Sequence, residues 1–329
     1  MVPQGQVASV TKPALRARRF LDFGEAMRTL ILVSVLGLLL SACSIKQTAV
    51  NMIGAALAGG GVYASDEDPE LVFEALPFGL KTYESLLETS PEHRGLLQAV
   101  AKGFTVYAYL LQNKADRLAE RELQRSRDMR ARASKLYLRG RDYALRGLAV
   151  AHEDFTARLY EDRTAALART GEDDIAFLYW AGASWAGALS AAKNDLDLVA
   201  ELPIAGALVA RVLDLDETYE LGAAHEFFIS YEGGRPGGSA ESAREHYRRA
   251  LELSGGARAS THLALAEAVI VSEQNLPEFR ALVAAALAVD PDAAPRLRLA
   301  NTVARRRAEW LRSRIPELFL EADPEEETS

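Results

Sequence analysis

The sequence predicts an all-α protein: a TPR-like array of helical hairpins (an α-solenoid) with a long inserted hairpin and a C-terminal capping helix. Three observations support this prediction. No stretch shows the alternation of apolar and polar residues between turns that a half-buried β-strand needs. Signals that begin and end helices recur along the chain. A spacing of small and aromatic residues typical of tetratricopeptide (TPR) repeats also returns several times.

The N-terminal part of the chain has the features of a lipoprotein signal peptide. Residues 30–40 form an apolar run of 11 residues, whereas a membrane-spanning helix needs about 20. The run ends in the sequence LSAC, which has the form of a lipobox. We therefore expect residues 27–42 to be a signal peptide that is cleaved between Ala42 and Cys43. The Cys43 thiol would then carry acyl chains such as palmitate, and two or three chains hold a protein firmly on a membrane.

Cys43 is the only cysteine among 329 residues, so the chain has no internal disulfide and no cysteine-based metal cluster. The alternative to lipidation is an inert cysteine in an ordinary signal peptide. Ser44, rather than an aspartate, follows the cysteine. By analogy with known bacterial lipoproteins, this predicts a location on the periplasmic side of the outer membrane.

Residues 1–26 contain four basic residues and no apolar block, which is unlike a signal peptide. We expect translation to begin at Met27 and residues 1–26 to be a misannotated extension. Loss of five basic and two acidic residues before Cys43 would change the net charge from −8 to −11. An acidic protein of this kind does not suit nucleic acid as its main partner.

The remaining chain divides into residues 43–66, the lipidated N-terminus and first helix, and residues 67–320, an all-helical TPR-like domain. Asp68, Ser239 and Asn275 are each expected to cap the N-terminus of a helix. Residues 170–174 are acidic and open a large apolar helix, and residues 255–256 (Gly-Gly) close a later one. The acidic residues 321–329 are expected to form a disordered tail.

The repeat pattern is that of the second helix of a TPR hairpin. It has a small residue first, an aromatic or apolar residue four positions on, a small or apolar residue seven positions on, and then a helix stop. Four partial matches are Gly79-Tyr83-Leu86-Pro91, Ala205-Val209-Val212-Glu217, Ala243-Tyr247-Ala250-Gly255 and Phe279-Val283-Ala286-Pro291, with Ala133-Tyr137-Gly140 a less regular fifth. Val212, Ala250 and Ala286 are 38 and 36 residues apart, close to the TPR period of about 34.

Two segments depart from plain repeats. Residues 96–147 predict a long helical hairpin whose charge-dense middle, residues 114–132, suits solvent exposure. Residues 295–320 predict a terminal helix that closes the end of the array. On that helix we expect Arg305, Arg306 and Arg307 on one side and Trp310 on the other.

The residues that could perform chemistry form no recognisable catalytic motif. The pair His225-Glu226 begins like a zinc-protease motif, but Ile229 stands where the second histidine would be needed. The five histidines have no ligand-like spacing, and residues 59–61 (Gly-Gly-Gly) lack the ending of a phosphate loop. We therefore expect no enzyme activity, no metal and no cofactor, although a triad assembled in space stays possible.

Aromatic residues gather on a few predicted helices. Trp180 and Trp185 are five residues apart and so lie about 140° apart around a helix, which allows one to pack in the core while the other faces a groove. A ligand groove is predicted from aromatic and polar candidates, namely Tyr83, Tyr107, Trp180, Trp185, His225 and Glu226. For each of them, ordinary core packing is the alternative.

Several long segments of the chain closely resemble the T-component lipoproteins of TRAP transporters (TatT). The resemblance extends over about 280 residues, essentially the whole chain after the lipobox. The matching segments are residues 43–61, 65–110, 178–195, 222–239, 243–256 and 264–275. It implies an all-helical periplasmic lipoprotein that associates with the substrate-binding (P) protein of a tripartite ATP-independent periplasmic transporter.

The resemblance also implies a homotrimer with a channel that meets the ligand cleft of the P protein, and small, often hydrophobic carboxylate ligands. The leading hypothesis is therefore an accessory protein that docks the P protein and passes a ligand. The alternative is a general TPR scaffold lipoprotein for envelope assembly with no small-molecule role. An envelope hydrolase is a third hypothesis, which would require turnover of a substrate.

Overall fold

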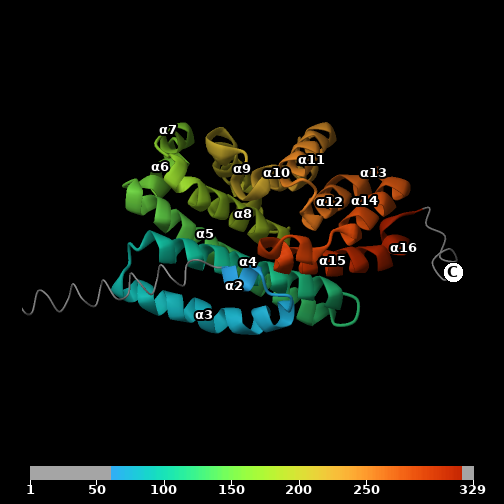
Figure 1. The fold of residues 1–329 in the computed structure, drawn as a ribbon. Coiled ribbons are helices and arrows are strands. Elements are labelled where there is room, and N and C mark those ends of the chain that lie inside the picture. Colours follow the sequence, from blue (N-terminus) through green and yellow to red (C-terminus); the bar gives the residue numbers. More distant parts are fainter. Residues whose placement is uncertain (1–60, 321–329) are drawn as a thin grey trace, which may run out of the picture. The chain divides into compact units, whose positions relative to one another are not determined.

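The structure, a computed structural model, describes residues 61–320. The chain divides into residues 1–52 and 53–329, and every described residue lies in the second of these units. The predicted signal peptide, the lipidation site at Cys43 and the acidic tail lie outside the described residues. Within residues 61–320 all regular structure is helical, which confirms the predicted all-α fold (Figure 1).

The first half of the described chain forms helical hairpins that follow one another along the sequence. Its helices are α2 (Gly61–Ala64), α3 (Pro69–Thr89), α4 (Arg94–Leu118), α5 (Leu123–Ala151), α6 (Phe155–Glu161), α7 (Arg163–Ala168), the 3-10 turn η1 (Glu172–Asp174), α8 (Ile175–Ala191) and α9 (Leu196–Asp216). Helices α4 and α5 pack along each other. They form the long hairpin that the sequence predicts over residues 96–147.

The second half begins at a 3-10 turn and contains shorter helices. They are η2 (Tyr219–Leu221), α10 (Ala223–Gly234), α11 (Ala240–Ser254), α12 (Ala259–Leu265), the π-helical turn η3 (Ala266–Ile270), α13 (Val271–Glu273), α14 (Leu276–Ala288), η4 (Pro291–Ala293), η5 (Pro295–Leu297), α15 (Arg298–Ser313) and α16 (Ile315–Leu318). The pairs α10–α11 and α12–α14 pack as hairpins.

The helix caps lie where the sequence predicts them. The Asp68 carboxylate accepts hydrogen bonds from the first backbone N–H groups of α3, and Ser239 and Asn275 do the same for α11 and α14. Gly255 and Gly256 have φ angles of 60° and 75°, so the left-handed backbone that ends α11 needs glycine. Val212, Ala250 and Ala286 are all buried, as the repeat pattern requires. The arrangement of the hairpins as a TPR solenoid stays a prediction.

Close approach of two helices depends on one glycine in α5. A Cβ atom at Gly147 would lie 2.1 Å from the Phe177 ring of α8. Only glycine therefore allows α5 and α8 to pack at this distance, and this contact fixes the position of the aromatic helix α8 against the long hairpin.

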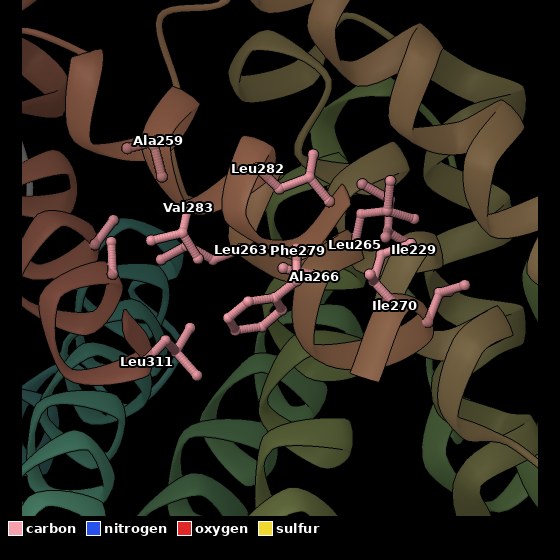
Figure 2. Packing of buried hydrophobic residues seen from close by; sticks show 14 of the residues in the cluster. Ile229, Ala259, Leu263, Leu265, Ala266, Ile270, Phe279, Leu282, Val283 and Leu311 are labelled. Carbon is pink, nitrogen blue, oxygen red and sulfur yellow. The ribbon is translucent and has the colours of Figure 1, made fainter. Parts of the chain in front are cut away.

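The core of the second half is a single apolar cluster that joins α10 to α16. The Phe279 side chain lies at its centre and is fully buried, and its ring meets the Phe319 ring edge to face at 4.9 Å. Figure 2 shows Leu263, Val283 and Leu311 in the same cluster, on three different helices. Burial of these side chains is what holds the short helices together, because apolar area removed from water is the main stabilising term.

Helix α15 returns to the first half of the chain and packs against α2, α3 and α4 (Figure 1). Two ion pairs join it there: Arg306 with Glu70 of α3 at 2.5 Å, and Arg307 with Asp116 of α4 at 2.6 Å. One prediction for this helix is wrong. The Arg307 guanidinium lies 4.2 Å from the centre of the Trp310 ring, because residues three apart share one face of a helix.

Candidate functional site

A cavity of about 230 Å³ lies between the early helices, α8 and the returning helix α15. Its lining comes from α2, α3, α4, α8, η2, α10, η5 and α15, together with Arg258 just before α12. Its volume is just below the range of about 300–1,000 Å³ that is usual for small-molecule sites. The cavity is the strongest candidate for a ligand site in residues 61–320.

The walls of the cavity are mostly apolar. Aliphatic surface comes from Leu76, Leu80, Val106, Leu110, Leu299 and Val303. Gly103 lets the Leu80 side chain pack close to α4, since a Cβ atom there would lie 2.7 Å from Leu80 Cδ2. Tyr63, Tyr83, Tyr109, Tyr179 and Trp180 contribute aromatic surface. A surface of this kind suits the apolar tail of a ligand. The tyrosine hydroxyls are polar groups that could orient a ligand there.

An aromatic cluster forms one side of the cavity. Ring centroids are 5.1 Å apart for Tyr179 and Trp180, and 5.4 Å apart for Tyr179 and Tyr219. Burial raises the pKa of Tyr179 to about 12 and raises the pKa of Tyr219 as well. Both phenols therefore stay protonated at neutral pH.

Four charged residues contribute to the cavity lining. Lys102, Arg258 and Arg296 are cationic, and Glu220 is the one carboxylate among the described lining residues. The Lys102 ammonium lies 5.6 Å from the centre of the Trp180 ring and 3.7 Å from the Glu220 carboxylate. The lining therefore has an excess of positive charge beside an apolar interior, which favours an anionic head group with an apolar tail.

Arg258 is held in the cavity wall by Glu226. The Arg258 Nε–H donates to the Glu226 carboxylate at 2.9 Å, and the Thr261 hydroxyl donates to the same oxygen at 2.9 Å. Burial alone would raise the pKa of Glu226, but the Arg258 charge together with the hydrogen bonds from Arg258, Ser260 and Thr261 lowers that pKa below its usual value. Glu226 therefore stays ionised and fixes the position of the guanidinium from outside the lining.

The turn that presents Glu220 to the cavity has an unusual backbone. Glu220, Leu221 and Gly222 have consecutive φ angles of 46°, 60° and 82°. Left-handed backbone costs about 1–2 kcal/mol for each residue other than glycine. The Arg258 Nη1–H donates to the Glu220 carbonyl at 3.1 Å and so holds the turn in place. Strain of this kind is often found at functional sites.

Two histidines lie behind this turn, on α10 and α11. The Nδ1 atoms of His225 and His246 are 2.8 Å apart, and His225 Nε2 lies 3.3 Å from the Glu217 carboxylate. Arg249 also donates to Glu217, and the two partners lower the pKa of Glu217 to about 2. Among the described residues no group of three or more His, Cys, Asp or Glu side chains could hold a metal ion.

The histidine pair predicts a pH dependence of stability. A hydrogen bond between the two Nδ1 atoms needs one donor and one acceptor, so at least one ring must be neutral. Burial lowers the pKa of His225, His246 and His262 below the usual value for histidine, about 6.5. The unfolded chain therefore takes up protons first as the pH falls through about 6.5, and the folded protein loses stability there.

We expect the thermal unfolding midpoint, followed by circular dichroism, to fall by on the order of a few degrees between about pH 7.5 and about pH 5.5. The carboxylates with lowered pKa values titrate below this window. His246→Phe keeps the ring that stacks on Phe228 but removes one titrating group, so its midpoint should fall less. An equal fall in both proteins would contradict the assignment.

Only two of the six predicted groove residues line the cavity, Tyr83 and Trp180. Trp185 lies in the core, 1% exposed, and its indole N–H donates to Glu201 at 2.9 Å. One tryptophan is thus in the core and the other faces the cavity, as the spacing of five residues allows. Tyr107 is buried against Phe73, with ring centroids 5.0 Å apart, and does not line the cavity.

The other two predicted residues, His225 and Glu226, are neighbours of lining groups rather than lining groups themselves. Sequence reasoning missed the charged lining residues Lys102, Glu220, Arg258 and Arg296, because each belongs to a different helix or turn. Among the lining residues that were missed, Tyr179 had a local signal, since it precedes Trp180 in an apolar helix.

In the part of the chain that the structure describes, no helix is both long enough and apolar enough to cross a membrane. The family model of the TRAP transporter T-component matches residues 65–319, which is more than half of the chain. An uncharacterized protein of Treponema pallidum (strain Nichols) is 29% identical over 307 residues, covering 86% of this chain and 95% of that protein.

Proposed function

We propose, because the chain belongs to the TRAP transporter T-component family, that it docks the substrate-binding (P) protein of such a transporter. We propose further that it passes a small organic-acid or hydrophobic ligand through the cavity. A transporter component is not an enzyme class, and we expect no catalytic activity. The observation that best supports a ligand role is the cavity, with its apolar and aromatic walls and its cationic groups at positions 102, 258 and 296.

The proposal includes a membrane tether. The lipobox that ends at Cys43 supports acylation of that thiol, and Ser44 supports sorting to the outer membrane, with the folded domain on its periplasmic side. A homotrimer is proposed from the family resemblance.

Co-purification tests the docking role. The tagged chain is captured from detergent-solubilised membranes of its own organism, and the captured proteins are identified by mass spectrometry. A P protein encoded beside this gene should be retained, and the Cys43→Ser chain should leave the membrane fraction. Failure to bind any P protein encoded nearby would overturn the docking role. Capture of envelope-assembly proteins instead of a P protein would support the alternative, a general TPR scaffold lipoprotein.

The ligand role predicts a specific effect of Trp180→Ala. The change removes one aromatic wall and the ring that faces Lys102. We expect affinity for octanoate, measured by isothermal titration calorimetry, to fall at least about fivefold. The helical circular dichroism signal should stay unchanged, because Trp180 is only half-buried.

Trp310→Ala is the matched control, since Trp310 lies on α15 outside the cavity lining. Its affinity for octanoate should equal that of the unaltered protein. Equal affinity in the Trp180→Ala protein would argue against ligand binding in this cavity. Loss of the helical signal in that variant would instead assign Trp180 a structural role.

A further inference from the structure

Glu220 is the one carboxylate among the described lining residues, and its side chain is weakly attached. Its carboxylate lies 3.7 Å from the Lys102 ammonium, and the two side chains are 40% and 41% exposed. An exposed ion pair at this distance gains little, because water screens it. By contrast, the carboxylate that accompanies Arg258 is mostly buried and accepts hydrogen bonds at 2.9 Å.

The backbone at Glu220 is in a strained conformation. Three consecutive residues, Glu220 to Gly222, have positive φ angles, and two of them are not glycine. The turn is fixed at both ends: Glu217 binds Arg249 and His225 on one side, and α10 begins at Ala223 on the other. At the tip, the Glu220 carbonyl accepts a hydrogen bond from Arg258, and backbone hydrogen bonds close the turn, whereas the Glu220 side chain has only the loose contact with Lys102 among the ion pairs of the described residues.

We propose that the Glu220 carboxylate is a built-in competitor for Lys102, which the carboxylate of a bound ligand displaces. The proposal rests on the proposed ligand role of the cavity. In the structure Glu220 forms an ion pair with Lys102. When a ligand anion takes the place of Glu220 beside Lys102, the Glu220 side chain turns to solvent.

The same geometry defines the class of ligand. Lys102 is the cation that a ligand carboxylate would meet, because Arg258 is already neutralised by Glu226. Apart from the exposed Arg296, the rest of the lining is mostly aliphatic and aromatic. The cavity therefore suits an amphipathic carboxylate, such as a medium-chain fatty acid, whose head group pairs with Lys102.

Binding of octanoate and of its neutral isostere octanamide tests the proposal, by calorimetry on the full chain. Glu220→Gln removes the competing charge and keeps the side-chain size. We expect it to bind octanoate about two- to fivefold more tightly than the unaltered protein, with no change for octanamide. Lys102→Gln should weaken octanoate but not octanamide. Glu241→Gln, an exposed carboxylate paired with Arg248 on α11, is the matched control and should change neither affinity.

Unchanged or weaker octanoate binding in Glu220→Gln, with normal binding in the unaltered protein, overturns the competitor role and leaves the ligand role intact. Binding of octanamide but not octanoate by the unaltered protein also overturns the inference alone. Binding of neither compound overturns the ligand role, and the inference with it. Circular dichroism of each variant checks that it is folded, so that a loss of affinity is not a loss of structure.

Discussion

Replacing Glu226 with alanine is expected to destabilise the protein by about 3–5 kcal/mol. The change leaves the Arg258 guanidinium in the cavity wall without the Glu226 carboxylate. The loss is large because only 15% of the Arg258 side chain is exposed to water. The change also removes the acceptor for the Thr261 hydroxyl. Urea unfolding followed by circular dichroism measures the effect as a lower midpoint with an unchanged slope.

The companion variants separate the charge from the packing. Arg258→Met alone should also destabilise the protein, because it leaves the Glu226 charge unpaired. The double variant Glu226→Leu with Arg258→Met removes both charges and should lose much less than the sum of the two single changes. A double variant whose loss equals that sum would show that the pair is not coupled. The double variant also removes a cation from the cavity lining.

Phe279→Ala is also expected to have a large effect. We expect it to lower the free energy of unfolding by about 3–5 kcal/mol. The ring is completely buried where α12, α14, α15 and α16 meet, and it contacts Phe319. Its removal leaves a cavity that the surrounding helices fill only in part. The thermal unfolding midpoint should fall by on the order of ten degrees, at about 2–4 °C for each kcal/mol in a domain of this size.

Phe78→Ala is the control for this change. It removes the same ring from α3, where 81% of the Phe78 surface is exposed. Its effect should stay within about 0.5 kcal/mol of zero. A loss in Phe279→Ala no larger than in the control would mean that the second half of the chain is not held by this cluster.

Much of the fold could be predicted from the sequence because its signals are local. The side chains of Asp68, Ser239 and Asn275 cap helices that begin within three residues of them. The hairpin of α4 and α5 could be predicted from two long helical patterns in succession. The face of Trp310 was predicted wrongly, because residues two positions apart, such as Arg305 and Arg307, point to different sides of a helix.

The cavity could be predicted only in part, because its lining comes from segments far apart in the chain. Tyr83 and Trp180 are aromatic residues on apolar helices, and this was enough to select them. The same criterion selected Trp185 and Tyr107, which are core residues. Glu220 has no signal of its own, since its left-handed backbone results from the turn between α9 and α10 rather than from a glycine at that position.

The return of α15 to the first helices has a consequence for how the cavity comes into being. Arg306 and Glu70 are 236 residues apart in the chain, yet they form an ion pair at 2.5 Å. Closing so long a loop carries an entropic cost that neighbouring hairpins avoid, so this contact is expected to form late in folding. The cavity then has its full lining only after the last helices have folded. A ligand that binds the finished cavity would slow its reopening at this junction, and a truncated chain would have the hairpins without the cavity.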